Sequence, residues 1–343
     1  MENFTTLLCC KRKNSKLKQK WLEEMNMNNT SHEGIKTIGV RNSGEFSTIP
    51  VLRVCVVTWN MNGKESSQDI EELLGDQEFD LLVVGLQEVP RCNVAQLLQQ
   101  ALVETHSLLG ESIMQSLQLF VFGLKNYELF IKDIQVDNYS VGGFGGLIGR
   151  KKGAVAISIS FKGIRMDFIS CHLSAHARNV EERNCELWGI SHSLFSKNQN
   201  PYSKPSQITV WLGDLNYRIE GIDTLPVRNL IQNNLHRLLT SKDQLLQEAE
   251  RGQIFNGYHE GTLAFKPTYK YDVGSNNYDT SHKVRVPSWT DRILFKIEKH
   301  GDIDAMLHSY ESLDCIESSD HKPVKALLCL KINKEESPSS VLK

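Results

Sequence analysis

The sequence predicts an α/β or layered β domain that begins near Val51. Short apolar runs of strand length recur from there to residue 332, and three longer stretches between them have the spacing of helices. A chain of 343 residues is long for one domain, but the range of single α/β and β-sandwich domains comes close to it. One large domain with flanking tails is therefore expected.

The individual elements are predicted from local patterns. Strands are expected at 51–57, 81–86, 164–171, 208–212, 293–297 and 324–332. Helices are expected at 94–109, between a cap at Asn93 and a stop at Gly110, at 179–196, and at 226–250. The last of these has Pro226 in its first turn and a predicted break near Ser241.

The segments outside this region show no comparable pattern. Residues 1–50 are predicted to form a flexible basic N-terminal tail, and residues 334–343 a disordered C-terminal tail. In the first of these, Cys9 and Cys10 stand beside a basic cluster at 11–13. Two exposed thiols in that setting could carry acyl chains and touch anionic lipid, or the segment could be a solvated tail.

Composition and charge exclude several classes of protein. With 40% hydrophobic residues, 23% charged residues and a net charge of -2, the chain lacks the broad basic character of a nucleic-acid-binding protein. Its apolar runs are far shorter than the roughly 20 residues that cross a bilayer, and the start MENFTTLLCCKRK lacks the pattern of a secretory signal. The eight cysteines show no zinc-type spacing. We expect a monomeric, cytoplasmic protein whose membrane contact, if any, is peripheral.

Polar side chains gather where the predicted strands meet loops. The set consists of Asn60, Glu88, His172, Asp214, Asn216, Asp291, Asp320 and His321. Any one of them could simply mark a turn. Because strand ends of a layered sheet protein can converge at one edge, where loops carry binding residues, the eight together predict one functional site.

Four of these residues suit a metal-assisted attack of water on a phosphate ester. Mg²⁺ takes oxygen ligands, so Glu88 with the amide oxygen of Asn60 would fit this ion. Asp214 and Asn216 are two residues apart and would project to the same side of an extended segment. They could therefore aim and deprotonate one water molecule.

The other polar residues suit the phosphate itself. His172, His321 and Asn216 could donate hydrogen bonds to the phosphoryl oxygens, and Asp291 could hold His321 in one tautomer. No residue of the set is a covalent nucleophile, so direct hydrolysis by water is expected in preference to a phospho-enzyme.

Eight ordered segments carry a family resemblance. They are TWNMNG (58–63), LQEV (86–89), SCHLSAH (170–176), ERN (182–184), WLGDLNYR (211–218), FKPTYKY (265–271), PSWTDR (287–292) and SDHKPV (319–324). Each is weak alone, but in this order the set closely resembles the motifs of the inositol polyphosphate 5-phosphatases, which belong to the endonuclease/exonuclease/phosphatase superfamily. The resemblance implies a catalytic domain over 51–333 with a four-layer α/β sandwich, two packed mixed β-sheets flanked by helices.

The resemblance also implies roles for single residues. It places Glu88, Asn60 and Asp320 at or near a Mg²⁺ ion, Asp214 and Asn216 at the attacking water, and His172, His321 and Asp291 at the scissile phosphate. In the family, residues matching Tyr269, Lys270, Lys283 and Arg285 hold the neighbouring 4-phosphate. Three cations and a phenol within seventeen residues suit a second phosphate. Tyr217 and Arg218 receive no role.

Two departures from the family pattern stand out. The family usually has Gly-Asn-Lys-Gly-Gly where this chain has Arg150, Lys151 and Lys152 before Gly153 and Ala154, in a glycine-rich segment without the spacing of a nucleotide-binding loop. The added charge could favour a more phosphorylated or membrane-presented head group, or be neutral. Cys171 stands where relatives often have Asn, and little consequence is expected from it.

Three functions remain as hypotheses. The first is a Mg²⁺-dependent 5-phosphatase of phosphoinositide head groups at a membrane, with soluble inositol polyphosphates as the alternative substrates. Apolar residues at 144, 147 and 148 favour lipid. The second is another phosphodiesterase of the superfamily, a nuclease or a sphingomyelinase, which the segments at 265–271 and 283–285 disfavour. The third is an inactive lipid-binding protein, which would lack Glu88, Asp214, Asn216 or His321.

Overall fold

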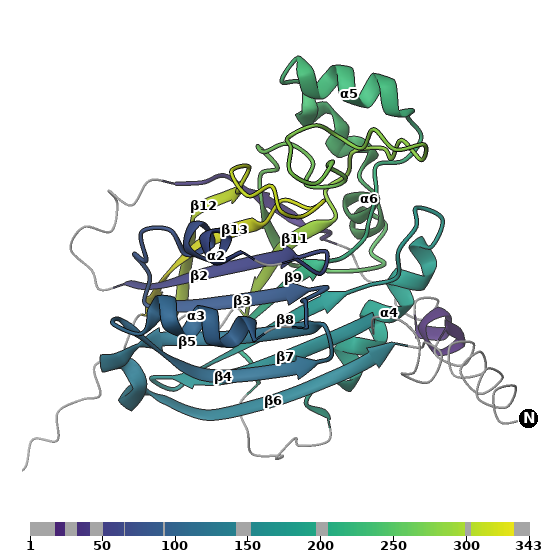
Figure 1. Cartoon of the computed structure of the whole chain (residues 1–343). Helices are drawn as coiled ribbons and strands as arrows, with labels where there is room; N and C mark the ends of the chain where they lie inside the picture. Colours follow the sequence, from purple (N-terminus) through teal and green to yellow (C-terminus); the bar gives the residue numbers. More distant parts are fainter. Residues whose placement is uncertain are drawn as a thin grey trace, which may run out of the picture.

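Two β-sheets packed face to face form the centre of the molecule (Figure 1). The computed structural model describes residues 18–24, 33–41, 51–64, 66–91, 93–141, 152–196, 205–298 and 303–332. Within these residues, helices cover the outer faces of both sheets. The arrangement confirms the predicted four-layer α/β sandwich.

Both sheets are mixed. The seven-stranded sheet has the order β1 (Lys36–Ile38), β10 (His259–Gly261), β11 (Asp291–Ile297), β9 (Ile208–Asp214), β8 (Ile164–His172), β7 (Lys152–Phe161) and β6 (Ile131–Val141). The six-stranded sheet has the order β12 (Ile303–Ser312), β13 (Val324–Ile332), β2 (Val51–Asn60), β3 (Leu81–Gln87), β5 (Leu117–Leu124) and β4 (His106–Met114). A parallel pair lies inside each sheet, β2 with β3 and β8 with β9.

The period of two along the strands builds three apolar layers. On β2, Val54 and Val56 face the layer between the sheets, whereas Cys55 and Val57 face the helices on the other side. Strands with both faces covered read as continuous apolar runs, which is why the sequence signals them strongly.

The helices occupy the two outer layers and one end of the molecule. α2 (Ser67–Leu74) and α3 (Val94–Leu102) pack on the six-stranded sheet, and α4 (Val180–Ser193) and α6 (Gln244–Glu250) pack on the seven-stranded sheet. Asn93 caps α3 by accepting from the backbone of Gln96 at 3.2 Å, as predicted. α5 (Thr224–Gln232) projects beyond the sheets at the top of Figure 1.

Two predicted helices differ from the structure. The helix expected over 94–109 is wrong beyond Leu102, because residues from His106 onward pair with β5 as strand β4. That strand is an edge strand whose exposed face leaves no continuous apolar run, so its pairing with β5 decides its state. The helix expected over 226–250 is three pieces, namely α5 with Pro226 in its first turn, a 3₁₀ helix at His236–Lys242, and α6.

The sequence pattern left several strands unpredicted, and two of them, β5 and β7, are long and mostly buried. β4, β5, β6, β7, β10 and β12 were not predicted. β1 lies within the predicted N-terminal tail, yet it pairs in parallel with β10. The prediction of a flexible tail is therefore corrected for this segment. A strand of three residues is too short to show a periodicity in the sequence, so it could not be predicted. In the same tail, Trp21 is 4% exposed and Glu24 accepts from Trp188 of α4 at 2.8 Å.

Some predictions fall outside the described residues. They concern Cys9 and Cys10, the glycine-rich residues up to Lys151, and the tail at 334–343. Among the residues that the structure does describe, no helix is both long enough and apolar enough to span a membrane.

Candidate active site

Three strands bring polar side chains into one row at the end of the seven-stranded sheet. In the strand register, Asp214 at the end of β9 stands opposite both His172 of β8 and Asp291 of β11. All three side chains are buried. The end of β2 meets this row from the other sheet, since Asn60 Nδ2 donates to Asp214 Oδ2 at 3.0 Å. The sandwich thus brings together strand ends that lie more than 150 residues apart in sequence.

Asp214 is held as a carboxylate by its neighbours. Besides Asn60, it accepts from the backbone N–H of Asn216 at 3.1 Å, and His172 Nε2 lies 3.3 Å from it. Burial alone would raise the pKa of Asp214. The hydrogen bond to His172 and the charge of His321 outweigh burial and hold this pKa well below its usual range. The carboxylate is therefore ionised at neutral pH.

His172 lies close to several charged side chains. Its Nε2 is hydrogen-bonded to Lys152 Nζ at the start of β7 and lies 3.9 Å from Glu88 Oε1. Burial and the positive charge of Lys152 lower the pKa of His172 from 6.5 to about 4, so the imidazole is neutral at pH 7. The sequence treated Lys152 only as a basic loop residue, and its contact with His172 was missed.

His321 has the opposite protonation state. Its Nδ1 lies 2.9 Å from Asp291 Oδ2, which also accepts from the hydroxyls of Thr268 at 2.7 Å and Thr290 at 2.8 Å. Burial would lower the pKa of His321, but the charge of Asp291 raises it to about 9. The result is a buried imidazolium whose ring faces the carboxylate of Asp291. Because both ring nitrogens are protonated, Asp291 stabilises the charge of the ring, whereas the sequence predicted that it would hold one tautomer.

The two asparagines of the site are fixed by further contacts. Ser319 donates to the backbone oxygen of Asn60 at 2.6 Å, and Asn60 Oδ1 accepts from the backbone of Asn62 at 3.1 Å. Asn216 has a positive φ of 58° and donates from Nδ2 to Leu173 O at 3.0 Å. Glu88 also has a positive φ, of 52°. Such backbone is uncommon outside glycine and clusters at functional sites.

The residues predicted for a second phosphate lie beside this row. The ring of Tyr269 is 4.4 Å from that of His321. Lys270 Nζ donates to Asp320 Oδ2 at 2.9 Å, and although burial opposes it, this pairing raises the pKa of Lys270. Arg285 lines a cavity of about 180 Å³ together with Tyr269. Lys283 is exposed, and within the described residues its side chain contacts none of the proposed catalytic residues.

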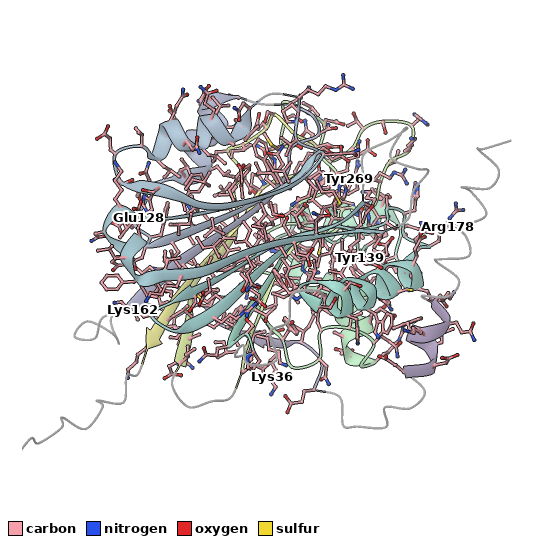
Figure 2. All side chains as sticks on the ribbon, turned by 90° about the horizontal axis from the view of Figure 1, so that it is seen from below. Lys36, Glu128, Tyr139, Lys162, Arg178 and Tyr269 are labelled. Carbon is pink, nitrogen blue, oxygen red and sulfur yellow. The ribbon has the colours of Figure 1, made fainter. Side chains whose placement is uncertain are left out.

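Further basic side chains lie at or near the same cavity. His176 and Arg218 belong to its lining. Burial and then the charges of Arg285, Arg178, Arg218 and Lys283 lower the pKa of His176, so each of these four cations lies within electrostatic reach of His176. In Figure 2, Tyr269 and Arg178 lie in the half of the molecule opposite Glu128 and Lys162. The sequence did not single out His176 or Arg178, although both follow His172 directly in the same loop.

The donor set fits a divalent cation. Buried Asp214, Asp291 and His321 offer ligand atoms that all lie within 4.8 Å of one another. His321 turns its Nδ1 to Asp291 and is protonated, so it suits a hydrogen-bond donor better than a ligand. Glu88 is 22% exposed in its side chain and lies near His172, and Asn60 Oδ1 keeps a second lone pair. Carboxylate and amide oxygens are suitable ligands for a hard cation.

Comparison with known proteins places this geometry in a family. Residues 57–327 match the model of Endonuclease/Exonuclease/phosphatase family 2. The type IV inositol polyphosphate 5-phosphatase 11 of Arabidopsis thaliana is 60% identical over 89% of this chain and 90% of that protein. The human phosphatidylinositol 4,5-bisphosphate 5-phosphatase A is 35% identical over 82% of this chain, which spans 31% of that longer protein.

A solved structure supports the same assignment. The inositol polyphosphate 5-phosphatase domain of SPsynaptojanin, in complex with inositol (1,4)-bisphosphate and a calcium ion, has a TM-score of 0.72 and 26% identity, with 92% of each chain covered. The fold, the ordered motifs and the extent of these matches agree with one another. The chain belongs to the inositol polyphosphate 5-phosphatase family of the endonuclease/exonuclease/phosphatase superfamily, and is a phosphoric monoester hydrolase.

Proposed function

We propose that this protein removes the 5-phosphate from phosphoinositides by direct attack of water, with Mg²⁺ as cofactor. Phosphatidylinositol 4,5-bisphosphate and 3,4,5-trisphosphate are the proposed substrates, and the 3,5-bisphosphate is a further candidate. One observation carries the proposal: an ionised Asp214 lies between a neutral His172 and a protonated His321, beside a cavity ringed by cations. The arrangement suits a multiply charged phosphate ester.

Glu88 and Asn60 are the proposed holders of the metal ion, with Asp320 near it. When bound, a divalent cation supplies charge neutralisation on the phosphate and lowers the pKa of a coordinated water. The calcium ion in the related structure supports a divalent cation in this family member.

The protein's own residues position the reactants. Asp214 and the amide of Asn216 are proposed to orient the attacking water and to receive its proton. Because the pKa of Asp214 is held low, orientation is expected to be its larger contribution. The imidazolium of His321 would donate to a phosphoryl oxygen, where negative charge develops in the transition state. A bond forms between phosphorus and the water oxygen, the bond from phosphorus to the inositol oxygen breaks, and the inositol oxygen takes up a proton from solvent and leaves as a hydroxyl group.

The cationic cavity is the proposed place of the 4-phosphate. Tyr269 and Arg285 line it, Lys283 lies close enough to influence His176, and Lys270 is adjacent in sequence. Charge-assisted hydrogen bonds from such groups would bind a phosphate and orient the ring. We propose that the side chains of this cavity make the enzyme select 4,5-bisphosphorylated head groups.

We propose a lipid substrate rather than a soluble one. The support is the similarity to a phosphatidylinositol 4,5-bisphosphate 5-phosphatase. The alternative is a 5-phosphatase of soluble inositol polyphosphates, because both substrates present the same phosphates. Peripheral attachment of a cytoplasmic protein through the basic segment at Cys9 and Cys10 belongs to the same proposal.

A phosphate-release assay tests the proposal. Phosphoinositides in vesicles and soluble inositol polyphosphates are compared with and without Mg²⁺, beside the variant Asp214→Asn. We expect Mg²⁺-dependent release from 4,5-bisphosphorylated lipid and a loss of about 100-fold or more in the variant, because the water loses its orienting charge. Release from soluble substrates alone would overturn the lipid assignment, and equal rates in the variant would overturn the role of Asp214.

A further inference from the structure

Arg218 contacts both parts of the proposed site. Its Nε donates to the backbone oxygen of Asn216 at 3.2 Å, and its Nη2 donates to the side-chain oxygen Oδ1 of the same residue. Its guanidinium carbon lies 4.2 Å from the centre of the Tyr269 ring. The backbone N–H of Arg218 is itself fixed by Gln244 Oε1 at 3.0 Å. One half-buried side chain therefore joins the water-orienting Asn216 to the proposed 4-phosphate cavity.

The contact with Arg218 determines how the amide of Asn216 is oriented. Nδ2 donates to Leu173 O, and Oδ1 accepts from Arg218. A flipped amide would turn its oxygen to a carbonyl oxygen and its N–H groups to the guanidinium, so both contacts would become repulsive. Only one N–H of Nδ2 is then left for a water or a phosphate. Because the backbone N–H of Asn216 donates to Asp214, a movement of Asn216 also reaches the carboxylate.

The contact between the Arg218 guanidinium and the Tyr269 ring is also specific. The Tyr269 ring that lies near Arg218 also lies near His321. The peptide of Tyr269 exchanges hydrogen bonds with Ser288, at 3.2 Å and 2.8 Å, which fixes the backbone that carries the ring. A planar guanidinium can stack on a ring and donate in its own plane at the same time, which an ammonium cannot do.

We propose that Arg218 is a positioning residue that couples the 4-phosphate cavity to the orientation of Asn216. This inference rests on the proposed function. A phosphate bound among Arg285, Tyr269 and Arg218 would restrain the guanidinium, and the guanidinium would hold the amide of Asn216 in its productive orientation. Binding energy from the 4-phosphate would then appear in kcat as well as in KM, because it is realised at the reacting centre.

The test compares two substrates that differ only in the 4-phosphate. Short-chain phosphatidylinositol 4,5-bisphosphate and phosphatidylinositol 5-phosphate are hydrolysed by the wild type and by Arg218→Ala, Arg218→Lys and Tyr269→Leu. In the wild type we expect a higher kcat with the 4-phosphate. The ratio of the two kcat values should fall by about tenfold in Arg218→Ala, which is a typical size for coupling between sites. Compared with Arg218→Ala, the variant Arg218→Lys should regain part of the wild-type KM but not the kcat ratio, because an ammonium group cannot make both contacts at once.

A matched control removes the positive charge of another arginine, one that does not contact Asn216. Arg178→Ala deletes an exposed cation near the cavity, and within the described part of the chain its side chain makes no contact with Asn216, so it should leave the kcat ratio unchanged. Tyr269→Leu removes the stacked ring and should lower the ratio independently, so the inference stays testable if Arg218→Ala does not fold, which thermal unfolding will show. Equal losses of kcat on both substrates, or changes in KM alone, would overturn the coupling. No release by the wild type from either substrate would instead overturn the proposed function, and this inference with it.

Discussion

Two buried histidines of the site differ in charge because of one neighbour each. His172 and His321 are both almost fully buried, and burial lowers the pKa of each. Lys152 adds a positive charge beside His172, whereas Asp291 adds a negative charge beside His321. A neutral and a charged imidazole therefore lie on either side of Asp214. Residue identity alone could not show this difference.

Glu186 is a buried acid whose titration should affect stability. Ser174, two residues after His172, donates to it from its backbone N–H at 2.9 Å and from its hydroxyl at 2.5 Å. Burial raises the pKa of Glu186 from 4.5 to about 7, although the bonds from Ser174 oppose this rise. The folded state therefore keeps this proton at pH values where the unfolded state has lost it.

We predict that Glu186→Gln removes one contribution to the pH dependence of stability. Because the folded state binds this proton more tightly, Glu186 adds up to about 3 kcal/mol to the free energy of unfolding at pH 4.5, and this contribution is lost by about pH 7. The glutamine keeps the acceptor for Ser174 but does not titrate, so the free energy of unfolding of the wild type minus that of the variant should fall by this amount across the window, since the histidines contribute equally to both proteins. Urea unfolding at several pH values measures both proteins, and parallel curves would contradict the assignment.

At the scale of elements, the row of site residues requires unusually close contact between β8 and β9. Gly213 has a φ of +141°, and a Cβ placed there would lie 2.0 Å from Cys171 O. Only a glycine can bring β9 this near to β8 immediately before Asp214. The close approach of the two backbones became visible only in the structure.

Gly213→Ala is predicted to displace Asp214 and to inactivate the enzyme. The matched control is Gly163→Ala, at the other end of β8, where φ is also positive at +86° but no atom lies within 4 Å of the added carbon. The control should lose about 1 to 2 kcal/mol of stability from backbone strain alone and keep its activity. Gly213→Ala should lose more in urea unfolding and release no phosphate. Similar losses in the two variants would show that the contact with Cys171 is unimportant.

At the scale of the molecule, a buried ionic network ties three layers together behind the site. Arg292, adjacent to Asp291, is fully buried and donates to Glu260 of β10 at 2.5 Å and 2.6 Å and to Asp243 at 2.9 Å. Asp243 caps α6, and Tyr310 of the other sheet donates to Glu260 at 2.9 Å. The strand that carries Asp291 is thus fixed to a helix and to both sheets.

We predict that Arg292→Met destabilises the protein by about 3 to 5 kcal/mol, because it leaves two buried carboxylates without their partner. Tyr310→Phe removes one neutral donor from the same network and should cost only about 1 kcal/mol. Guanidinium chloride unfolding of the two variants measures the difference. A loss of less than 1 kcal/mol in Arg292→Met would mean that the network does not hold the layers.

The sequence predicted those parts of the fold that have strong local signals. Strands such as β3 and β13 are buried on both faces and read as continuous apolar runs, so their positions were predicted nearly to the residue. β4 and β6 lie at sheet edges with exposed faces, and β1 has three residues, so local patterns gave no signal for them. The predicted residues Asn60, His172, Asp214, Asp291 and His321 lie together. Lys152 received no catalytic role because its partner His172 lies on another strand, and Arg218 received none because the Tyr269 ring that it contacts is distant in sequence.

By itself, the sequence determined the fold class, the family and the residue types that a phosphate ester requires, because these depend on periodicity and on ordered motifs. Only the tertiary structure decided the protonation of His172 and His321, the contact of Lys152 with the site, and the link from Asn216 through Arg218 to Tyr269. These properties depend on distances between side chains from different strands and loops. Such distances are set by how the two sheets pack, and no local pattern in the chain encodes them.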